Sequence, residues 1–362
     1  MKQKKVLAGM SGGVDSSVAA ALLKEEGYDV TGVFMKIWDE RTPCSKTFSK
    51  HACYSPWGKD IEDIKKVAGI LDIKLLVIDL AEEYKDIVLG YFRKEYKEGR
   101  TPNPCVICNR FLKFGLLPER AALSAGFSFD FLATGHYAFT GHNGRTGRYF
   151  LKKGADKNKD QSYFLFMLTQ QQLSRLILPL GGYTKKQVRS LAKKYRLPVE
   201  NKEESQDFLS GDRTFLFGGG VEAGPVTDKN GNILGRHQGI VNYTVGQRKG
   251  LGIAAGRPLY VTGIDAGKNT VILGEKKDVY KKTLTAGSLN LVSIQKISAP
   301  MKVEAKVRYK HAAASAVIDK PDSKGMFSVL FDKPQWAVTP GQAVVFYKKD
   351  ILLGGGFIAN SL

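Results

Sequence analysis

Two short segments of the sequence carry residue types that can do chemistry at a defined spacing. The first runs Gly9-Met10-Ser11-Gly12-Gly13-Val14-Asp15-Ser16-Ser17 and falls between a predicted strand and a predicted helix. Glycines let a ligand approach the backbone, serines add hydrogen-bond donors, and the N–H groups at a helix start favour a phosphate group. The segment therefore predicts a phosphate-binding turn.

This turn differs from two common nucleotide-binding motifs. A Walker loop requires Gly-Lys followed by Ser or Thr at the helix start, where this chain has Val14-Asp15-Ser16. A dinucleotide-binding turn requires the spacing G-x-G-x-x-G, which this segment does not have. Either the turn belongs to another class of phosphate-binding loop, or it is only a glycine- and serine-rich connection before a helix.

The second segment holds Cys105 and Cys108, and two further cysteines, Cys44 and Cys53, precede it. A C-x-x-C pair can converge on one centre or form a disulfide. The preceding Thr-Pro-Asn-Pro keeps the chain extended before a predicted helix, where a thiolate is favoured. Because a reducing cytosol disfavours structural disulfides, catalysis or metal binding explains these cysteines better.

The residues around both segments alternate between strand and helix patterns. This alternation indicates an N-terminal α/β domain, a doubly wound parallel sheet covered on both faces. Strands are expected at residues 4–10, 29–37, 74–80 and 129–137, and helices at residues 17–27, 60–71, 81–99, about 109–125 and 184–196, the last with Thr184 as N-cap. Cys44 and Cys53 follow the second strand, so they belong to the carboxyl edge of the sheet, where open α/β folds bind ligands.

After about residue 205 the pattern changes to short runs that alternate with period two between glycine-rich turns. Such runs occupy residues 239–245, 258–264, 269–274, 302–309, 327–331 and 342–347. They indicate two small β-rich modules, the last a β-barrel. The expected domains are residues 1–204, 205–286 and 287–362.

Composition indicates a folded protein with a polyanionic partner. The chain has 362 residues, is 43% hydrophobic, and carries a formal net charge of +20. This composition is far from that of disordered chains, and an excess of positive charge favours nucleic acid through the release of counterions from phosphates. Solubility alone is the simpler explanation of the charge. The sequence has no apolar run long enough to cross a membrane and no signal peptide at its start, so we expect a cytoplasmic protein with no membrane partner.

The first segment resembles the pyrophosphate-binding loop of the ATP pyrophosphatases, also called PP-loop enzymes. Further segments, at residues 99–114, 132–138, 158–165, 235–253 and 307–310, resemble the tRNA-specific 2-thiouridylase family, so the likeness spans nearly the whole chain. This resemblance implies a tRNA 2-thiouridine synthase, a sulfurtransferase. It would adenylate the 2-carbonyl of the wobble uridine with ATP, releasing pyrophosphate, and replace the oxygen by sulfur, releasing AMP.

The resemblance also implies the nucleotide site and the RNA site. Residues expected to bind ATP are Gly9, Met10, Ser11, Gly12, Gly13, Val14, Asp15, Ser16, Met35 and Gly135. Asp15 is also expected to act in catalysis by placing Mg²⁺, which prefers carboxylate oxygens. Residues expected to contact the target base or the anticodon loop of tRNA are Asn103, Pro104, Cys105, His136, Lys159, Asp160, Gln161, Arg308, Tyr309 and Gln342.

The cysteines depart from the family pattern. Cys108 matches the family's nucleophile, but the usual second catalytic cysteine is replaced by Leu209. Either Cys105 takes over that role as a thiol partner of Cys108, or three cysteines hold a [4Fe-4S] cluster. The expected ligands of such a cluster are Cys53, Cys105 and Cys108, with Cys44 as the alternative third ligand, and a zinc site is the simplest competitor.

A donor such as a cysteine desulfurase or a sulfur-relay protein is the implied source of sulfur. Two other functions remain open at this stage. One is an ATP pyrophosphatase that delivers ammonia to a small molecule, as an amidotransferase or synthetase. The other is a non-catalytic RNA-binding module with a vestigial nucleotide loop.

Overall fold

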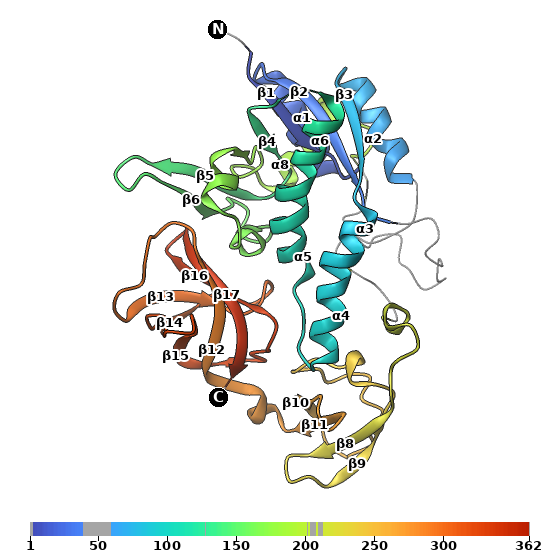
Figure 1. The fold of residues 1–362 in the computed structure, drawn as a ribbon, viewed down its shortest axis with the longest axis vertical. Coiled ribbons are helices and arrows are strands. Elements are labelled where there is room, and N and C mark those ends of the chain that lie inside the picture. Colours follow the sequence, from blue (N-terminus) through green and yellow to red (C-terminus); the bar gives the residue numbers. More distant parts are fainter. Residues whose placement is uncertain are drawn as a thin grey trace. The chain divides into compact units, whose positions relative to one another are not determined.

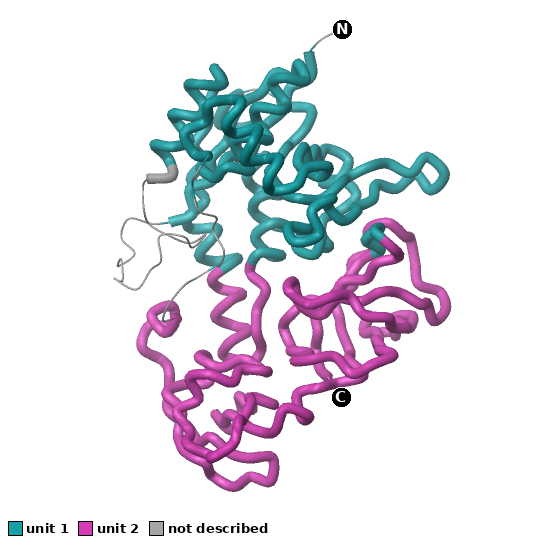
Figure 2. The backbone as a smooth tube through the Cα atoms, turned by 180° about the vertical axis from the view of Figure 1, so that it is seen from behind, with its two compact units in different colours: residues 1–88, 105–211, 350–353 teal, residues 89–104, 212–349, 354–362 magenta. Residues whose placement is uncertain are grey.

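The computed structural model describes residues 3–38, 59–126, 128–200, 202, 208 and 213–361 (Figure 1). The chain divides into two compact units, each built from separate stretches of sequence. Unit 1 comprises residues 1–88, 105–211 and 350–353, and unit 2 comprises residues 89–104, 212–349 and 354–362 (Figure 2). The division into three domains expected from the sequence remains a prediction.

Unit 1 is built on a parallel five-stranded sheet of order β3-β2-β1-β4-β7. The strands are short apolar runs, β1 (Lys5–Gly9), β2 (Asp29–Lys36), β3 (Lys74–Asp79), β4 (Phe131–Ala133) and β7 (Leu176–Ile177). Helices α1 (Val14–Glu25), α2 (Lys59–Ile70) and α8 (Lys185–Lys194) share one hydrophobic core with β1 and β2. Helix α6 (Leu117–Ala125) packs against β3. The prediction of a doubly wound α/β domain is confirmed.

Two long helical stretches change their geometry along their length. The first consists of α3 (Ala81–Tyr84), a π-helix at Lys85–Leu89 and α4 (Gly90–Lys97). The second begins with α5 (Pro104–Ile107), continues as a π-helix at Cys108–Leu116 and ends in α6. The second stretch thus starts five residues before the predicted start at Asn109, because proline is well tolerated in the first turn of a helix. Single π-helical turns often mark functional sites.

Unit 1 also contains elements that the sequence patterns did not suggest. An antiparallel hairpin of β5 (Ala138–Asn143) and β6 (Arg148–Lys153) follows β4, and Ile351 and Leu352 of β17 (Ile351–Ser361) pair with β6. Helix α7 (Gln170–Ser174) begins at a capping box on Thr169. The predicted strand 129–137 is shorter, because only residues 131–133 pair with β1.

Unit 2 contains a four-stranded sheet and a closed barrel. The sheet has the order β10-β11-β8-β9, with β8 (Gly224–Asp228), β9 (Ile233–His237), β10 (Tyr260–Asp265) and β11 (Thr270–Gly274). The barrel consists of β12 (Tyr280–Leu291), β13 (Met301–Lys306), β14 (Ala314–Ile318), β15 (Phe327–Trp336), β16 (Ala343–Lys348) and β17. A direct pairing of β12 with β17 closes it, so the predicted C-terminal β-barrel is confirmed.

One predicted strand of unit 2 is wrong. Residues 239–245 alternate like a strand, but residues 240–242 form a 3₁₀ turn. Gly239 has φ +127° there, and its N–H donates to Nδ1 of His237 at 2.9 Å. The two apolar residues that follow, Ile240 and Val241, are both buried, as in a turn packed on a core rather than a strand with one wet face.

Candidate active site

The glycine- and serine-rich turn lies where the strand order of the parallel sheet reverses. β1 is followed along the chain by β2 on one side, whereas β4 pairs with its other side. Open α/β sheets bind ligands outside the carboxyl ends of the strands at such a switch point. Residues 10–13 continue from the end of β1, and residues 134–136 continue from the end of β4. The topology therefore brings two of the predicted motifs together.

The loop is shaped to present backbone N–H groups at the start of α1. Gly12 has φ +76°, a conformation that favours glycine, and Gly13 is an extended N-cap without a side chain. Ser16 Oγ accepts the N–H of Ser11 at 3.1 Å, and Ser17 Oγ donates to the Gly13 carbonyl at 2.9 Å. The hydroxyls hold the loop, and the first-turn N–H groups of a twelve-residue helix are suited to an anion.

Gly135 and Met35, which the resemblance assigns to ATP, lie near this loop. A Cβ on Gly135 would be 2.7 Å from the Asp15 carbonyl carbon and 2.8 Å from the Ser16 nitrogen, so only glycine fits there. Met35 is half-buried near the end of β2, two residues beyond Val33, whose carbonyl accepts the Met10 N–H at 2.8 Å. The two predicted parts of the nucleotide site are thus adjacent in unit 1.

Asp15 has two side-chain partners that sequence inspection missed. Tyr137 donates its hydroxyl to Asp15 Oδ1 at 2.6 Å, and the Lys185 ammonium lies 2.8 Å from each carboxylate oxygen. Lys185 is the first residue of α8, held there by its N–H bond to Asp156 and by the capping box of Thr184. The Lys185 side chain is 12% exposed, and its ammonium lies beside the loop. In the sequence, the only indication of this position was that Thr184 was predicted as an N-cap, which makes Lys185 the first residue of the helix.

A neighbouring hydroxyl and an aromatic ring fix the His136 imidazole in its position. Its Nδ1 is 2.8 Å from the Thr134 hydroxyl, and its ring lies 5.7 Å from that of Phe114. Burial, with a smaller contribution from the charge of Lys113, lowers the pKa of His136 well below its usual value. A neutral imidazole can donate one hydrogen bond and accept another, but it offers no charge to a phosphate.

The Cys105 and Cys108 thiols are both half-buried. Cys105 is the second residue of α5, and Cys108 begins the π-helix that continues it. Residues three apart on a helix have Cβ atoms about 5–6 Å apart, so the two thiols face the same side. Gln172 donates its amide to the carbonyls of Arg110 and Phe114 at 2.9 and 3.0 Å, which fixes this π-helix.

The predicted tRNA contacts of unit 1 form a loop with extensive internal bonding. Asp160 is buried, and its carboxylate accepts the N–H groups of Gly154 and Ser162 at 3.2 and 3.1 Å. Gln161 accepts the Tyr137 N–H through its side chain at 3.0 Å. Lys159 is half-buried in the same loop. Asp160 and Gln161 thus shape the loop that follows the hairpin.

In unit 2, residues 100–103 have no regular secondary structure and form a segment, called the strap, that ends at the buried Asn103. The amide nitrogen of Gln342 donates to the carbonyls of Thr101 and Pro102 at 3.1 and 2.9 Å. The buried Pro104 follows the strap and starts α5.

The remaining predicted RNA ligands lie just after β13 in the same unit. Arg308 donates to the Val245 carbonyl at 2.9 Å and to the hydroxyl of Thr339. The ring of the half-buried Tyr309 lies 5.3 Å below the Lys306 ammonium. The terminal nitrogen of the Arg308 guanidinium is therefore used within unit 2.

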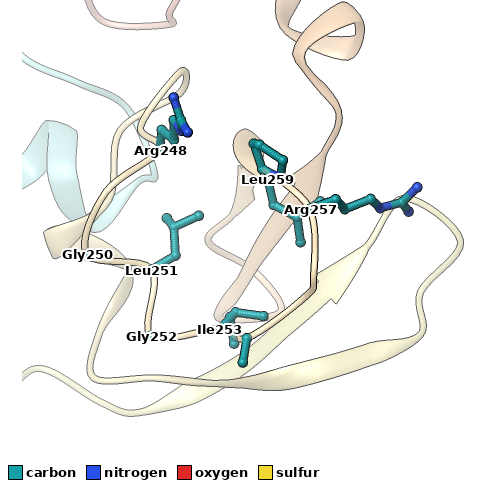
Figure 3. A pocket seen from close by; sticks show the side chains of 9 residues that line it. Arg248, Gly250, Leu251, Gly252, Ile253, Arg257 and Leu259 are labelled. Carbon is teal, nitrogen blue, oxygen red and sulfur yellow. The ribbon is translucent and has the colours of Figure 1, made fainter.

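A hollow of about 490 Å³ lies beside β10 in unit 2. Figure 3 shows that Leu251 and Leu259 line it, whereas Arg257 extends away and pairs with Glu275 at 3.0 Å. Arg248 stands on the rim and is exposed. This arrangement places one cation near an apolar surface, with no buried polar group that would select a ligand among the residues that line it.

The predicted metal ligands are only partly within the described residues. Cys44 and Cys53 lie outside them, and so does Leu209. Among the residues that the structure describes, no group of three or more His, Cys, Asp or Glu side chains is placed to hold a metal ion.

Within the described part of the chain, no helix has the length and apolar character to span a bilayer.

A parallel sheet with a glycine- and serine-rich loop at its switch point defines a nucleotide-binding α/β domain of the PP-loop type, followed here by a β-sheet and a β-barrel. Sequence profiles match all three parts. The tRNA methyl transferase HUP domain matches residues 4–209, the tRNA methyl transferase PRC-barrel domain residues 218–275, and the aminomethyltransferase beta-barrel domain residues 281–358.

Curated relatives agree along the full chain. The tRNA-specific 2-thiouridylase MnmA of Endomicrobium trichonymphae is 49% identical over 98% of this chain and 99% of its own length. That of Acetivibrio thermocellus is 47% identical over 99% of this chain and 100% of its own length. The chain belongs to the tRNA-specific 2-thiouridylase family, as predicted. Among solved structures, a 4-thiouridine synthetase in complex with RNA and ATP is 15% identical, covers 59% of this chain and 45% of that one, and has a TM-score of 0.35.

Proposed function

We propose that the chain is an ATP-dependent tRNA-uridine 2-sulfurtransferase that converts the wobble uridine of certain tRNAs to 2-thiouridine. Its relatives are named for this activity over the same length of chain. The observation that carries the proposal is the contact of Gly135 with the backbone of Asp15 and Ser16, because it joins two family motifs into one nucleotide site.

ATP converts the 2-oxygen of uridine, which is a poor leaving group, into a good one. The 2-oxygen of uridine attacks the α-phosphorus, so that pyrophosphate departs and the oxygen carries AMP. Sulfur then replaces this oxygen, which leaves as part of AMP. The loop of residues 9–16 binds the phosphates through N–H groups at the start of α1.

Asp15 and Lys185 fit a magnesium–ATP complex. Mg²⁺ takes carboxylate and phosphate oxygens, and Asp15 offers a carboxylate at the first turn of α1. When bound, Mg²⁺ would neutralise charge on the phosphates. The ammonium of Lys185 now faces Asp15 at 2.8 Å and would be released toward the triphosphate.

The cysteine chemistry rests on Cys108 as nucleophile and Cys105 as its partner. In the thiol-pair mechanism, Cys105 carries a persulfide sulfur, and Cys108 forms the disulfide when that sulfur is delivered, so an external thiol must reduce the pair afterwards. In the alternative, a [4Fe-4S] cluster would be held by Cys53, Cys105 and Cys108, with Cys44 as the alternative to Cys53. Because the third ligand falls outside the described residues, no step is derived through the cluster.

This chemistry requires a protein that donates sulfur. The proposed donor is a cysteine desulfurase or a sulfur-relay protein, and the proposed location of the enzyme is the cytoplasm. In the proposed arrangement, residues 1–204 adenylate the base, residues 205–286 contact tRNA, and residues 287–362 form the barrel module. The contacts to the target base and the anticodon loop are assigned to Asn103, Pro104, Cys105, His136, Lys159, Asp160, Gln161, Arg308, Tyr309 and Gln342.

The test is made without oxygen on purified protein with tRNA and a sulfide source. We expect AMP and pyrophosphate to form only when tRNA carrying the target uridine is present, and 2-thiouridine to appear in the digested tRNA by mass spectrometry. ATP cleavage with a small acid but not with tRNA would indicate a synthetase instead, and tRNA binding without any cleavage would indicate an RNA-binding module.

Iron and acid-labile sulfide are measured on the wild type and on Cys44→Ala and Cys53→Ala variants. Iron that is lost only with Cys53 supports a cluster with that ligand. If iron is lost only in Cys44→Ala, then Cys44 rather than Cys53 is the third ligand. If the anaerobic wild type contains no iron, the thiol-pair mechanism is supported instead of the cluster.

A further inference from the structure

We propose that the loop of residues 154–161, called the RNA loop, transmits the binding of tRNA to the ATP site through Tyr137. Tyr137 acts as a positioning residue, because the RNA loop holds its backbone and its hydroxyl holds Asp15. The inference rests on the proposed function, in which residues of the RNA loop contact tRNA and Asp15 belongs to the ATP site. All of these residues lie in unit 1.

The Tyr137 ring is fixed by packing, and its hydroxyl reaches the start of α1. Tyr137 is 2% exposed and shares one hydrophobic core with Val14 and Val18 of α1. The hydroxyl donates to Asp15 Oδ1 at 2.6 Å, the length of a hydrogen bond to a charged oxygen. A carboxylate can only accept, so the direction of this bond is defined. A movement of Tyr137 therefore displaces an oxygen of the Asp15 carboxylate.

The RNA loop holds the backbone of Tyr137 by two hydrogen bonds. The Tyr137 N–H donates to Gln161 Oε1 at 3.0 Å, and the Tyr137 carbonyl accepts the Gln161 N–H at 2.9 Å. Because an N–H donor must face the oxygen of the side-chain amide, the amide nitrogen of Gln161 points away from Tyr137. Gln161 can therefore bond Tyr137 and an RNA group at the same time.

The RNA loop is stiff enough to transmit a displacement. The buried Asp160 carboxylate accepts the N–H groups of Gly154 and Ser162 at 3.2 and 3.1 Å, which ties the two ends of the loop together. A Cβ on Gly154 would be 2.8 Å from the Tyr137 oxygen, so the loop also packs directly on the Tyr137 carbonyl. RNA that shifts Gln161 must therefore shift Tyr137 as well.

The RNA loop also holds the other partner of Asp15. Asp156 accepts the backbone N–H of Lys185 at 3.0 Å, and the Lys185 ammonium lies 2.8 Å from each oxygen of the Asp15 carboxylate. Tyr137 and Lys185 thus both reach Asp15 from backbone positions that are bonded to the RNA loop. Of these two routes, the Tyr137 hydroxyl is the one that a conservative substitution removes.

Linkage makes this coupling measurable without any chemical step. If tRNA places the Asp15 carboxylate for ATP, then tRNA tightens the binding of ATP, and ATP tightens the binding of tRNA by the same factor. The probe is α,β-methylene-ATP, which cannot be cleaved between its α and β phosphates. Its Kd is measured by equilibrium dialysis with Mg²⁺, in the absence and in the presence of a saturating tRNA transcript that carries the target uridine.

Tyr137→Phe is the main variant, because it removes the hydroxyl and keeps the buried ring. In the wild type, we expect tRNA to lower the Kd of the analogue by about fivefold or more. In Tyr137→Phe this factor should fall below about twofold, while the Kd for tRNA alone stays within about twofold of the wild-type value.

Tyr195→Phe is the matched control. Tyr195 also donates its hydroxyl to a carboxylate of α1, but this carboxylate is Glu25, at the opposite end of the helix from Asp15. The control removes the same atom from the same residue type without touching the RNA loop. It should keep the wild-type factor by which tRNA lowers the Kd of the analogue.

Gln161→Met is a second variant, which removes the acceptor of the Tyr137 N–H and leaves the Tyr137 hydroxyl in place. At saturating tRNA it should lose the same coupling, even where its own affinity for tRNA is lower. The double variant should lose no more coupling than either single variant, because both act on one route. Gln161→Met also tests the proposal if Tyr137→Phe fails to fold.

Two results would overturn the proposal. The first is a wild-type protein in which saturating tRNA leaves the Kd of the analogue unchanged. The second is a Tyr137→Phe variant that keeps the wild-type factor, whatever its affinity for the analogue, because the hydroxyl would then hold Asp15 without transmitting tRNA binding. If the wild type makes no 2-thiouridine, the proposed function fails, whereas the effect of tRNA on the analogue still decides the role of Tyr137.

Discussion

The Lys185 ammonium donates to both carboxylate oxygens of Asp15 at 2.8 Å, although the two residues are 170 positions apart in the sequence. The pair joins the start of α1 to the start of α8. With side chains 12% and 30% exposed, it is more protected than a surface ion pair. A triphosphate that binds the loop competes with Asp15 for this cation.

Lys185→Met should therefore weaken the ATP-dependent step. A hydrogen bond to a charged group contributes about 1.5–3 kcal/mol, so AMP formation should fall about 10- to 100-fold. Lys185→Arg should retain part of the rate, because it keeps the charge. The measurement is tRNA-dependent release of AMP and pyrophosphate. Unchanged release by the methionine variant would show that Lys185 serves only to hold Asp15.

The close contact of Gly135 with the loop gives a second prediction. In Gly135→Ala, the new methyl would meet backbone atoms of Asp15 and Ser16 at under 3 Å, and these cannot swing aside. Overpacking of this kind costs about 1–3 kcal/mol, and the displaced loop should bind ATP more weakly. Equilibrium dialysis with labelled ATP measures this. Among the residues that the structure describes, none outside the backbone of α2 itself has an atom within 4 Å of the new methyl in Gly69→Ala, so this variant should bind ATP normally.

The sequence predicted the nucleotide loop because all of its parts except Met35 and Gly135 are contiguous, and it predicted Thr184 as an N-cap because the capping box is local. It could not reveal Lys185 as the partner of Asp15, since that contact requires α1 and α8 to pack together. The strand predicted at residues 239–245 failed for a related reason. A bond from Gly239 to the His237 ring turns the chain, and no period-two pattern reports such a bond.

For the predicted RNA-site residues too, the sequence could not show which groups each side chain contacts. Sequence resemblance indicated that Asp160, Gln161 and Gln342 matter, but it could not say to what they bond. In the structure each one has its hydrogen bonds within its own unit. Whether they also touch RNA remains a prediction.

His136 makes stability depend on pH in a predictable direction. Its pKa is lowered well below 6.5 by burial, so below pH 6.5 the unfolded chain binds a proton that the folded chain does not. The free energy of unfolding therefore falls by up to about 1.4 kcal/mol for each pH unit below 6.5, until the lowered pKa is reached. Well above pH 6.5, His136 contributes no pH dependence. His136→Asn should remove this part of the slope. Urea unfolding of both proteins between pH 7 and pH 5 measures it, and equal slopes would contradict the assignment.

The thiols give the sharpest prediction for the chemistry. Cys108→Ala should abolish 2-thiouridine formation, with a loss greater than about a thousandfold, because no other group at this position can serve as the nucleophile. Binding of ATP and tRNA should be unchanged, since neither the loop nor the strap is altered. Cys105→Ala should give the same loss whether Cys105 carries sulfur or holds a cluster. A wild-type content of 2-thiouridine in tRNA treated with the Cys108→Ala variant would contradict the assignment of Cys108 as the nucleophile.

A matched control lies between the two cysteines. Ile107 is buried, so Ile107→Val perturbs the same helical turn and removes one methylene at a cost of about 0.5–1.5 kcal/mol. If the thiols act chemically, this variant should keep most of the thiolation rate despite its lower melting temperature. A loss as large as that of Cys108→Ala would mean that the helix, rather than the thiol, is what the reaction requires.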